Sequence, residues 1–145
     1  MTTATIRAAR PTDLSAVHSL LTHADLPLDG VPSDLAHFFV AEREGEVVGA
    51  IGLEPYGAAA LLRSAVVAPG ERGTGVGERL VRSLLDEAKR HRMHEVVLLT
   101  TTAESWFPRF GFNKVSREAV PDAVKQSVEF TSACPASATV MTLAL

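Results

Sequence analysis

The sequence predicts one α/β (α+β) domain, spanning residues 1–145, with a mixed central sheet flanked by helices. A chain of 145 residues suits a single domain with a real core, because a chain of this size buries roughly 68–70% of its unfolded surface. Two short apolar segments on either side of a Glu-Gly-Glu turn at 44–46 predict an antiparallel β-hairpin. A buried strand, a glycine-rich loop, an amphipathic helix and a second buried strand follow over residues 60–102. That order predicts a right-handed β-α-β unit with parallel strands.

The first half of the chain is expected to form three strands, one helix and one irregular loop. Apolar residues at positions 14, 17, 20 and 21 share one helix face, directly after a proline and an aspartate that supply turn and N-cap chemistry. Prolines at 27 and 32 and a glycine at 30 interrupt any helix, so the segment around them is expected to be an irregular or partly helical loop that could cover a site. The expected elements are a strand at Thr5–Ala8, a helix from Leu14, a loop at Leu26–Leu35, and strands at Phe38–Arg43 and Val47–Leu53.

The second half is expected to carry the β-α-β unit and a less regular C-terminal part. Apolar residues recur every four positions from Val76 to Ala88, which is typical of an amphipathic helix. The run Val96–Leu99 followed by three threonines is the strongest strand signal in the chain. The expected elements are a strand at Ala60–Val67, a loop at Gly70–Gly77, a helix from Val76 to near His91, a strand at Glu95–Thr102, short helices at Ala103–Phe110 and Pro121–Phe130, and a final strand at Thr139–Leu145.

Composition restricts the classes of partner. Fourteen Lys and Arg against seventeen Asp and Glu give a net charge of -3, which argues against a nucleic-acid binder with a basic face. The single cysteine, Cys134, allows no intrachain disulfide and fits a reducing cytoplasm; it is interpreted as a small buried apolar residue rather than an acyl carrier. Met1–Arg10 lacks an apolar export signal, and no apolar run is long enough to span a membrane. Small-molecule substrates are therefore expected, with no nucleic acid and no membrane as partner.

The loop Arg72–Gly77 is the first candidate binding site. It lies between a buried strand and a helix, where free backbone N–H groups and the helix dipole favour an anion such as a phosphate or pyrophosphate. Glycines let the main chain approach phosphate oxygens closely, and Arg72 adds positive charge. A dinucleotide-binding fingerprint would need glycine where Glu78 stands, and a Walker loop would need lysine after its last glycine. Neither nucleotide motif is present.

This loop, with its flanking elements, resembles the GNAT superfamily of acyl-CoA-dependent N-acetyltransferases. Arg72, Gly75 and Gly77 match its Arg/Gln-x-x-Gly-x-Gly/Ala motif, Val66–Pro69 is similar to its strand end, and Trp106–Phe112 is similar to its aromatic helix followed by Gly-Phe. The resemblance implies a mostly antiparallel sheet with a splayed parallel pair, acetyl-CoA as cosubstrate, and direct transfer in a ternary complex. It also implies that coenzyme A is bound by Val66, Val67, Arg72, Gly73, Thr74, Gly75, Val76 and Gly77.

Within the superfamily, the chain resembles two groups that act on amino-acid-like amines. Leu99–Thr102, Trp106-Phe107, Gly111-Phe112 and Val120-Pro121 resemble the acetyltransferase domain of N-acetylglutamate synthases. The ending from Glu129-Phe130 to Cys134–Ala138 is similar to arsenic-resistance N-acetyltransferases. The resemblance implies N-acetylation of a glutamate-like compound or an organoarsenical analogue, with a role in detoxification. The alternatives are a protein or peptide N-acetyltransferase, and a non-catalytic acyl-CoA-binding regulatory module.

The candidate catalytic residues depart from the family pattern. Where many members carry a tyrosine that protonates the leaving thiolate, this chain has Phe107. Thr101 or its neighbouring threonines, Ser105, or water could donate instead. The oxyanion donor is expected to be a backbone N–H near Val66 or Val67. Glu54 is the candidate base; the alternative is that Glu54 is only a solvated residue at the end of a strand.

Arg63 and Ser64 interrupt an otherwise apolar strand. A guanidinium there needs anionic partners, and a substrate carboxylate is a good match; an internal ion pair with Glu54 is the equally open alternative. Tyr56 could border the same pocket. No metal site is expected from His91, His94 and Glu95, which lie at a helix end. A homodimer is possible through the edge of the final strand.

Overall fold

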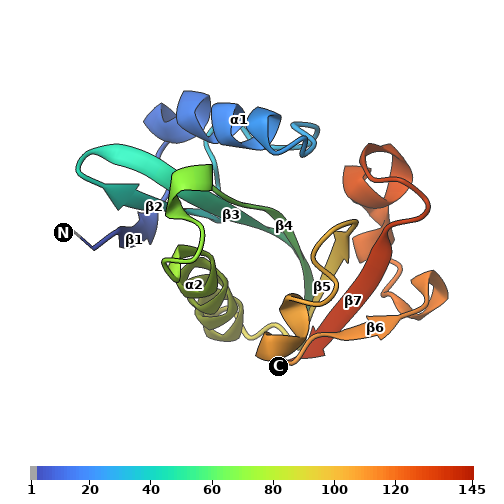
Figure 1. The fold of residues 1–145 in the computed structure, drawn as a ribbon. Helices are drawn as coiled ribbons and strands as arrows, with labels where there is room; N and C mark the ends of the chain where they lie inside the picture. Colours follow the sequence, from blue (N-terminus) through green and yellow to red (C-terminus); the bar gives the residue numbers. More distant parts are fainter. Residues whose placement is uncertain (1–2) are drawn as a thin grey trace.

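The computed structural model describes residues 3–145 and contains a seven-stranded sheet in the order β1-β2-β3-β4-β5-β7-β6 (Figure 1). The elements are β1 (Thr5–Ala8), α1 (Leu14–His23), β2 (Phe38–Arg43), β3 (Glu46–Tyr56), β4 (Ala59–Val67), α2 (Val76–Arg90), β5 (Glu95–Thr100), β6 (Asn113–Val115) and β7 (Thr139–Ala144). The β4–β5 pair is parallel and the other neighbouring pairs are antiparallel. The predicted mixed, mostly antiparallel sheet is therefore confirmed. Met1 and Thr2, the start of the Met1–Arg10 segment, lie outside the described residues.

The two helices cover opposite faces of strands β1 to β4 (Figure 1). Successive side chains of a strand point to opposite faces, and here Val40 packs with α1 whereas Ala41 packs with α2. Toward the C-terminal half, the α1 side of β5 and β7 is covered instead by the turns around Val120 and Val124. A gap in the covering layer therefore lies between α1 and these turns. Among the described residues, no helix is both long and apolar enough to cross a membrane.

Several predicted elements are wrong in extent or type. β5 ends at Thr100 rather than Thr102, because the Thr100 side-chain oxygen accepts a hydrogen bond from the backbone N–H of Ala103 (2.9 Å) and turns the chain. The helix expected over 103–110 is only a 3-10 turn at Phe107–Phe110, where Pro108 lacks the N–H that an α-helix needs. The helix expected over 121–130 is two separate turns, one 3-10 and one π, and the three-residue strand β6 was not predicted.

The last strand is not an edge. β7 pairs with β5 on one side and with β6 on the other, so the edges of the sheet are β1 and β6. The final strand was expected to offer an open edge that a second copy of the chain could cover. That edge does not exist, because β6 is already paired with it.

The parallel pair is splayed, as the resemblance implied. β4 and β5 pair only from Ala59↔Glu95 to Leu61↔Val97, and beyond this point the two strands have no register partners in common. A bulge sits where they part: the β3–β4 register shifts between Ala50 and Gly52, and Ser64 has a left-handed φ of 57°. Bulges increase the local bend of a strand, so the bend at Ser64 carries the end of β4 away from β5.

Candidate active site

A pocket of about 1020 Å³ opens where β4 and β5 diverge. It runs from the N-terminus of α2 to the turns of the C-terminal segment, and α1 borders it through the residues that follow the helix. The predicted residues that line it are Arg63, Ser64, Val66, Val67, Thr101, Arg72, Gly73, Gly75, Val76 and Gly77. Glu54, Tyr56, Thr74 and Ser105 are not among its lining residues.

The glycine-rich end of the pocket has the geometry of an anion site. Gly75 is the N-cap residue of α2 with a φ of 84°, and Gly73 has a φ of 82°. These left-handed values cost a residue with a side chain roughly 1–2 kcal/mol and glycine almost nothing. The first backbone N–H groups of a helix have no partner inside the helix, and Val76 and Gly77, the first two residues of α2, line the pocket.

The wall of the pocket between loop and sheet is the open side of β4. Val66 and Val67 pair with Ala50 and Gly49 of β3, and on their other side β5 has already diverged. Their backbone on that side is therefore available to an extended ligand, as an unpaired strand edge is in general. The expected use of these two residues in coenzyme binding stays a prediction.

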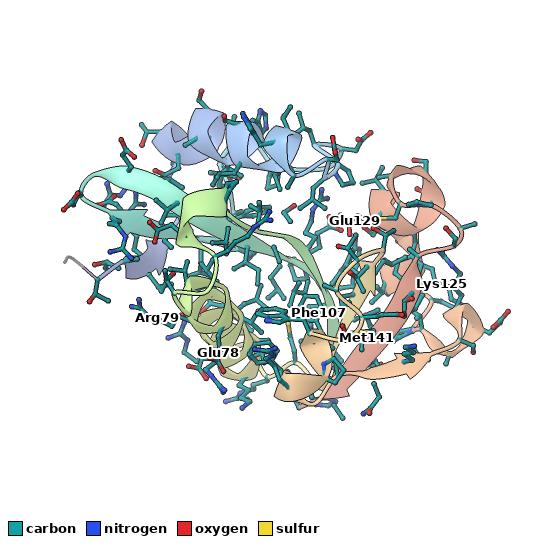
Figure 2. The ribbon with its side chains drawn as sticks, viewed as in Figure 1. Glu78, Arg79, Phe107, Lys125, Glu129 and Met141 are labelled. Atoms are coloured by element: carbon teal, nitrogen blue, oxygen red, sulfur yellow. The ribbon has the colours of Figure 1, made fainter. Side chains whose placement is uncertain are left out.

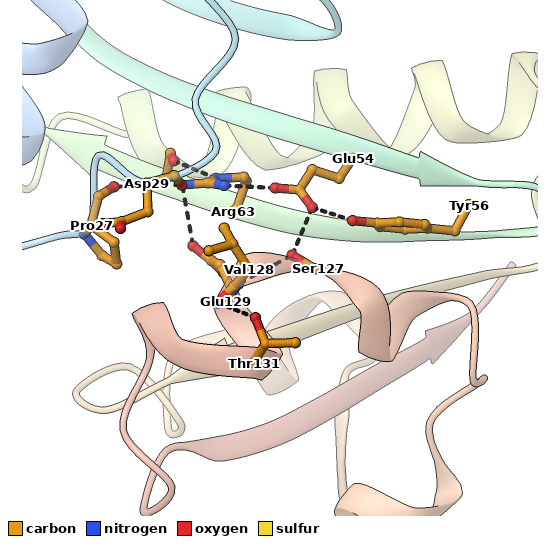
Figure 3. A network of polar contacts seen from close by, with 10 residues as sticks. Pro27, Asp29, Glu54, Tyr56, Arg63, Ser127, Val128, Glu129 and Thr131 are labelled. Carbon is orange, nitrogen blue, oxygen red and sulfur yellow. Dashed lines mark hydrogen bonds and ion pairs between the residues drawn. The ribbon is translucent and has the colours of Figure 1, made fainter.

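At the other end of the pocket, Arg63 lies in a buried polar network (Figure 3). Its side chain is 0% exposed. Nη1 lies 2.6 Å from Oε2 of Glu54, Nε donates to Oγ of Ser64 at 3.0 Å, and Nη2 donates to the carbonyl oxygen of Asp29 at 2.7 Å. Glu129 is a second carboxylate beside it, 3.6 Å from Nη2. The internal ion pair with Glu54, one of the two interpretations left open by the sequence, is present, and a substrate carboxylate could reach Arg63 only by replacing one of these acceptors.

Glu54 is held as a carboxylate. Burial raises its pKa, but hydrogen bonds from Tyr56 (2.6 Å), Arg63 and Ser127 (2.7 Å) outweigh burial and leave the pKa below its ordinary value. For Tyr56, burial and its hydrogen bond to Glu54 raise the pKa. A carboxylate with three donors is a weak proton acceptor. Glu54 therefore serves to hold Arg63 and Ser127 in place, and its assignment as the base stays a prediction that this geometry does not favour.

Glu129 is the functional candidate that the sequence reasoning missed. It begins the single π-turn Glu129–Ala133, lines the pocket, and faces β4 (Figure 2). Burial, reinforced by the charge of Glu54 and opposed by that of Arg63, raises its pKa to about 7. Among the described residues, no donor hydrogen-bonds its carboxylate. The sequence placed Glu129 in a weak helix pattern, where an acidic residue is usually solvated, and in the C-terminal segment of the family resemblance, without assigning it a role.

The remaining candidates occupy varied positions. Phe107 is buried against Trp106 and Phe112 in the core on the α2 side (Figure 2). Thr101 follows the end of β5 and lines the pocket, whereas Ser105 is exposed outside it. Cys134 is only partly buried and lines the pocket, which corrects its expected full burial. Burial and the charge of Glu129 raise the pKa of its thiol to about 11, so it is protonated and a poor nucleophile near neutral pH.

Two histidines approach each other away from the pocket. Within the described residues, donor atoms of His37, Glu87 and His91 lie within 4.8 Å of one another near the C-terminal end of α2. His91 contacts Glu87 at 3.5 Å and meets the His37 ring edge to face. His94 and Glu95, which the sequence grouped with His91, do not belong to this cluster. The expectation that the chain binds no metal stays a prediction.

An open parallel strand pair beside a glycine-rich helix N-terminus is an arrangement suited to an elongated, phosphate-bearing ligand. Residues 34–114 match the family model of the acetyltransferase (GNAT) domain. This match covers more than half of the chain, and the chain therefore belongs to the GNAT acetyltransferase family.

Named relatives and solved structures agree with this family. The chain is 34% identical over 91 residues to an amino-acid acetyltransferase of Ralstonia nicotianae, covering 61% of this chain and 20% of that protein. It is 33% identical over 116 residues to a probable N-acetyltransferase camello of Xenopus tropicalis, covering 75% of this chain and 53% of that protein. The chain thus spans about a fifth and about half of these two relatives.

Two solved structures share the fold over nearly the whole chain. Rv2747 from Mycobacterium tuberculosis, in complex with CoA and NLQ, superposes with a TM-score of 0.84 at 25% identity, covering 97% of this chain and 99% of that one. The N-acetylglutamate synthase of Neisseria gonorrhoeae, complexed with coenzyme A and N-acetyl-glutamate, gives a TM-score of 0.85 at 19% identity, covering 100% of this chain and 36% of that one. The second likeness concerns the fold alone.

Proposed function

We propose that the chain is an acetyl-CoA-dependent N-acetyltransferase that transfers acetyl directly to the amino group of a small amino-acid-like substrate. The observation that carries this proposal is the divergence of β4 and β5 beside the N-terminus of α2. The named amino-acid acetyltransferase relative and the coenzyme-bound Rv2747 support it. A glutamate-like compound or an organoarsenical analogue is the proposed acceptor, with detoxification in the cytoplasm as the role; the resemblance of the C-terminal segment supports that choice.

The residues present fit the coenzyme. The N–H groups at the start of α2, with Arg72 at the rim and glycines that expose the backbone, would hold the pyrophosphate. Val66 and Val67 would hold the pantetheine arm along the open side of β4. When bound, acetyl-CoA supplies an activated acetyl thioester.

The chain's own groups would then act on that thioester. A backbone N–H near Val66 or Val67 would polarise the carbonyl. Thr101, like the neighbouring Thr100 and Thr102, lines the pocket whereas Ser105 does not, and Thr101 would give the proton that Phe107 cannot give. Because a thiolate is a tolerable leaving group near neutral pH, this weaker donor is sufficient.

The proposal is tested by thiol release from acetyl-CoA in the presence of amino acids, glutamate analogues containing phosphorus or arsenic, polyamines and a basic peptide. We expect turnover with carboxylate-bearing primary amines. Coenzyme binding without thiol release for every amine would replace the proposal with a non-catalytic acyl-CoA-binding module. Turnover confined to the peptide would keep the enzyme class and overturn the small-molecule acceptor.

Substitution of Gly75 tests the coenzyme loop. Gly75→Ala is expected to raise KM for acetyl-CoA by about tenfold or more, because the left-handed φ of 84° at the helix N-cap must relax and redirect the N–H groups. Gly45→Ala is the matched control, since Gly45 has the same φ of 84° and equally open surroundings in the β2–β3 turn. Both variants are expected to lose similar stability, because the strain at φ 84° is the same. An equal KM in the two variants would remove the loop from the coenzyme site.

Direct transfer predicts that Cys134 carries no acetyl group. Cys134→Ser is expected to keep kcat within roughly twofold, because the thiol is protonated at neutral pH and an acyl-cysteine step is not required. Intact mass measurement after incubation with acetyl-CoA alone checks the same point. Acetylation of the wild-type protein that is absent in Cys134→Ser would contradict direct transfer.

A further inference from the structure

A partly buried carboxylate and a buried one share one guanidinium at the acceptor end of the pocket. Glu54 comes from β3, Glu129 from the C-terminal π-turn, and Arg63 from β4 between them. Their side chains are 17%, 5% and 0% exposed respectively. Among the described residues, Arg63 is the only cation within ion-pair distance of either acid. With both carboxylates ionised, this end of the pocket carries one unbalanced negative charge.

The two acids have opposite environments. Glu54 receives hydrogen bonds from Tyr56, Arg63 and Ser127, while Glu129 faces Arg63 at 3.6 Å without a hydrogen bond. Glu129 lines the pocket and Glu54 does not. Two nearby carboxyl groups whose environments separate their proton affinities mark an assignment of acid-base roles. The group with the free lone pairs, the higher proton affinity and access to the pocket is Glu129.

We propose that Glu129 is the proton acceptor for the acceptor amine, which enters this end of the pocket as an ammonium ion. The proposal rests on the proposed function and names a residue and a charge state for it. The unbalanced charge attracts a cation, and the carboxylate oxygens without donors are the groups available to an N–H. The Arg63–Glu54 pair has a positioning role. Glu54 does not line the pocket, and its ion pair holds the Arg63 guanidinium beside Glu129.

The proton balance of the step is complete. One proton passes from the ammonium nitrogen to the Glu129 carboxylate, which frees the nitrogen lone pair to form the C–N bond with the acetyl carbonyl carbon. The C–S bond breaks and sulfur keeps the bonding pair. The Thr101 hydroxyl protonates sulfur and recovers a proton from the second N–H of the attacking nitrogen. Glu129 returns its proton to water after product release. No oxidant, metal or further reactant is required.

Other charged groups near Glu129 are compatible with this role. From β3, Glu54 raises its proton affinity, and from β4, Arg63 lowers it. Cys134, on the segment that follows the π-turn, is a neutral thiol, and the loop before β2 contributes the backbone carbonyl of Asp29 to Arg63 rather than a charge to Glu129. The resulting pKa of about 7 matches the operating range of a general base.

The test compares Glu129→Gln with Glu118→Gln, an exposed acid on the same C-terminal segment, in the full chain. At pH 7, Glu129→Gln is expected to lower kcat by roughly 10²–10⁴-fold, the range for a positioned general base. KM for acetyl-CoA should stay unchanged. The deficit should shrink toward pH 9, where an α-amino acceptor with a pKa of about 8 deprotonates in solution. Glu118→Gln should match the wild type throughout.

A second readout needs no turnover. In protein labelled with ¹³C at the glutamate carboxyl carbons, one resonance is expected to titrate near pH 7 and to disappear in Glu129→Gln. If Glu129→Gln turns over at the wild-type rate with the wild-type pH profile, the role of Glu129 is overturned and the proposed function is left intact. A glutamate titration only in the ordinary range would overturn it as well. Absence of thiol release by the wild type with every amine would overturn both proposals.

Discussion

Replacing Arg63 with alanine is expected to lower the free energy of unfolding by about 3–5 kcal/mol at pH 7, because it leaves Glu54 and Glu129 buried without their shared counter-ion. The loss also frees the carbonyl of Asp29, which accepts a hydrogen bond from Nη2. Gly30 packs on the same guanidinium so closely that an added Cβ would lie 2.9 Å from Nη1. Removal of Arg63 therefore leaves a cavity as well as unpaired charge.

Urea unfolding at several pH values measures this effect. Without Arg63, both carboxyl groups take up protons more readily, so the deficit should be largest near pH 8 and shrink toward pH 5. Arg82→Ala is the matched control, because its ion pair with Glu78 is exposed (63% and 43%) and such pairs contribute roughly 0–1 kcal/mol. Arg63→Lys should fall between the wild type and alanine, since an ammonium cannot reproduce the fork of donors. A deficit below about 1 kcal/mol at pH 7 would contradict the structural role of Arg63.

The sequence predicted what local patterning encodes. The hairpin, the β-α-β unit and the glycine-rich loop follow from apolar spacing and from glycine at Gly73 and Gly75, and the structure places those elements where the pattern predicts them. The sequence predicted that Arg63, a guanidinium in an apolar strand, needs an anionic partner, and left a substrate carboxylate and Glu54 as alternatives. The structure shows the ion pair with Glu54.

The rest depends on contacts between distant segments. Ser127 bonds to Glu54 across 73 positions of the chain, and this contact helps to divide the predicted C-terminal helix into two turns and places Glu129 against β4. The left-handed φ of Ser64 is a second example, because serine does not favour that conformation and only the surrounding sheet imposes it. The base candidate was missed for this reason: its neighbourhood is assembled by tertiary structure.

The buried carboxyl group of Glu129 is expected to make the protein less stable as the pH rises, and Glu129→Gln is expected to remove that dependence. Its folded-state pKa of about 7 lies above its ordinary value of 4.5, so the folded state binds the proton more tightly than the unfolded chain does. The resulting stability is fully present below about pH 4.5 and is lost as the pH rises through 7. A difference of this size corresponds to about 3 kcal/mol.

Glu129→Gln is therefore expected to unfold at higher urea concentration than the wild type at pH 8, by about 2–3 kcal/mol in free energy, and to match it near pH 4.5. Groups with lowered pKa that lie away from Glu129, such as Asp13 and Glu87, act in the opposite sense. Their contribution is present above their unfolded pKa values and lost as the pH falls, so it is common to both proteins and cancels in the difference. Equal free energies of unfolding for the wild type and Glu129→Gln at pH 8 would contradict this prediction, because they would show that ionisation of Glu129 does not destabilise the folded protein. The expected gain in stability accompanies the expected loss of kcat, because the buried carboxylate that we propose as the proton acceptor is also a charge whose ionisation destabilises the folded state.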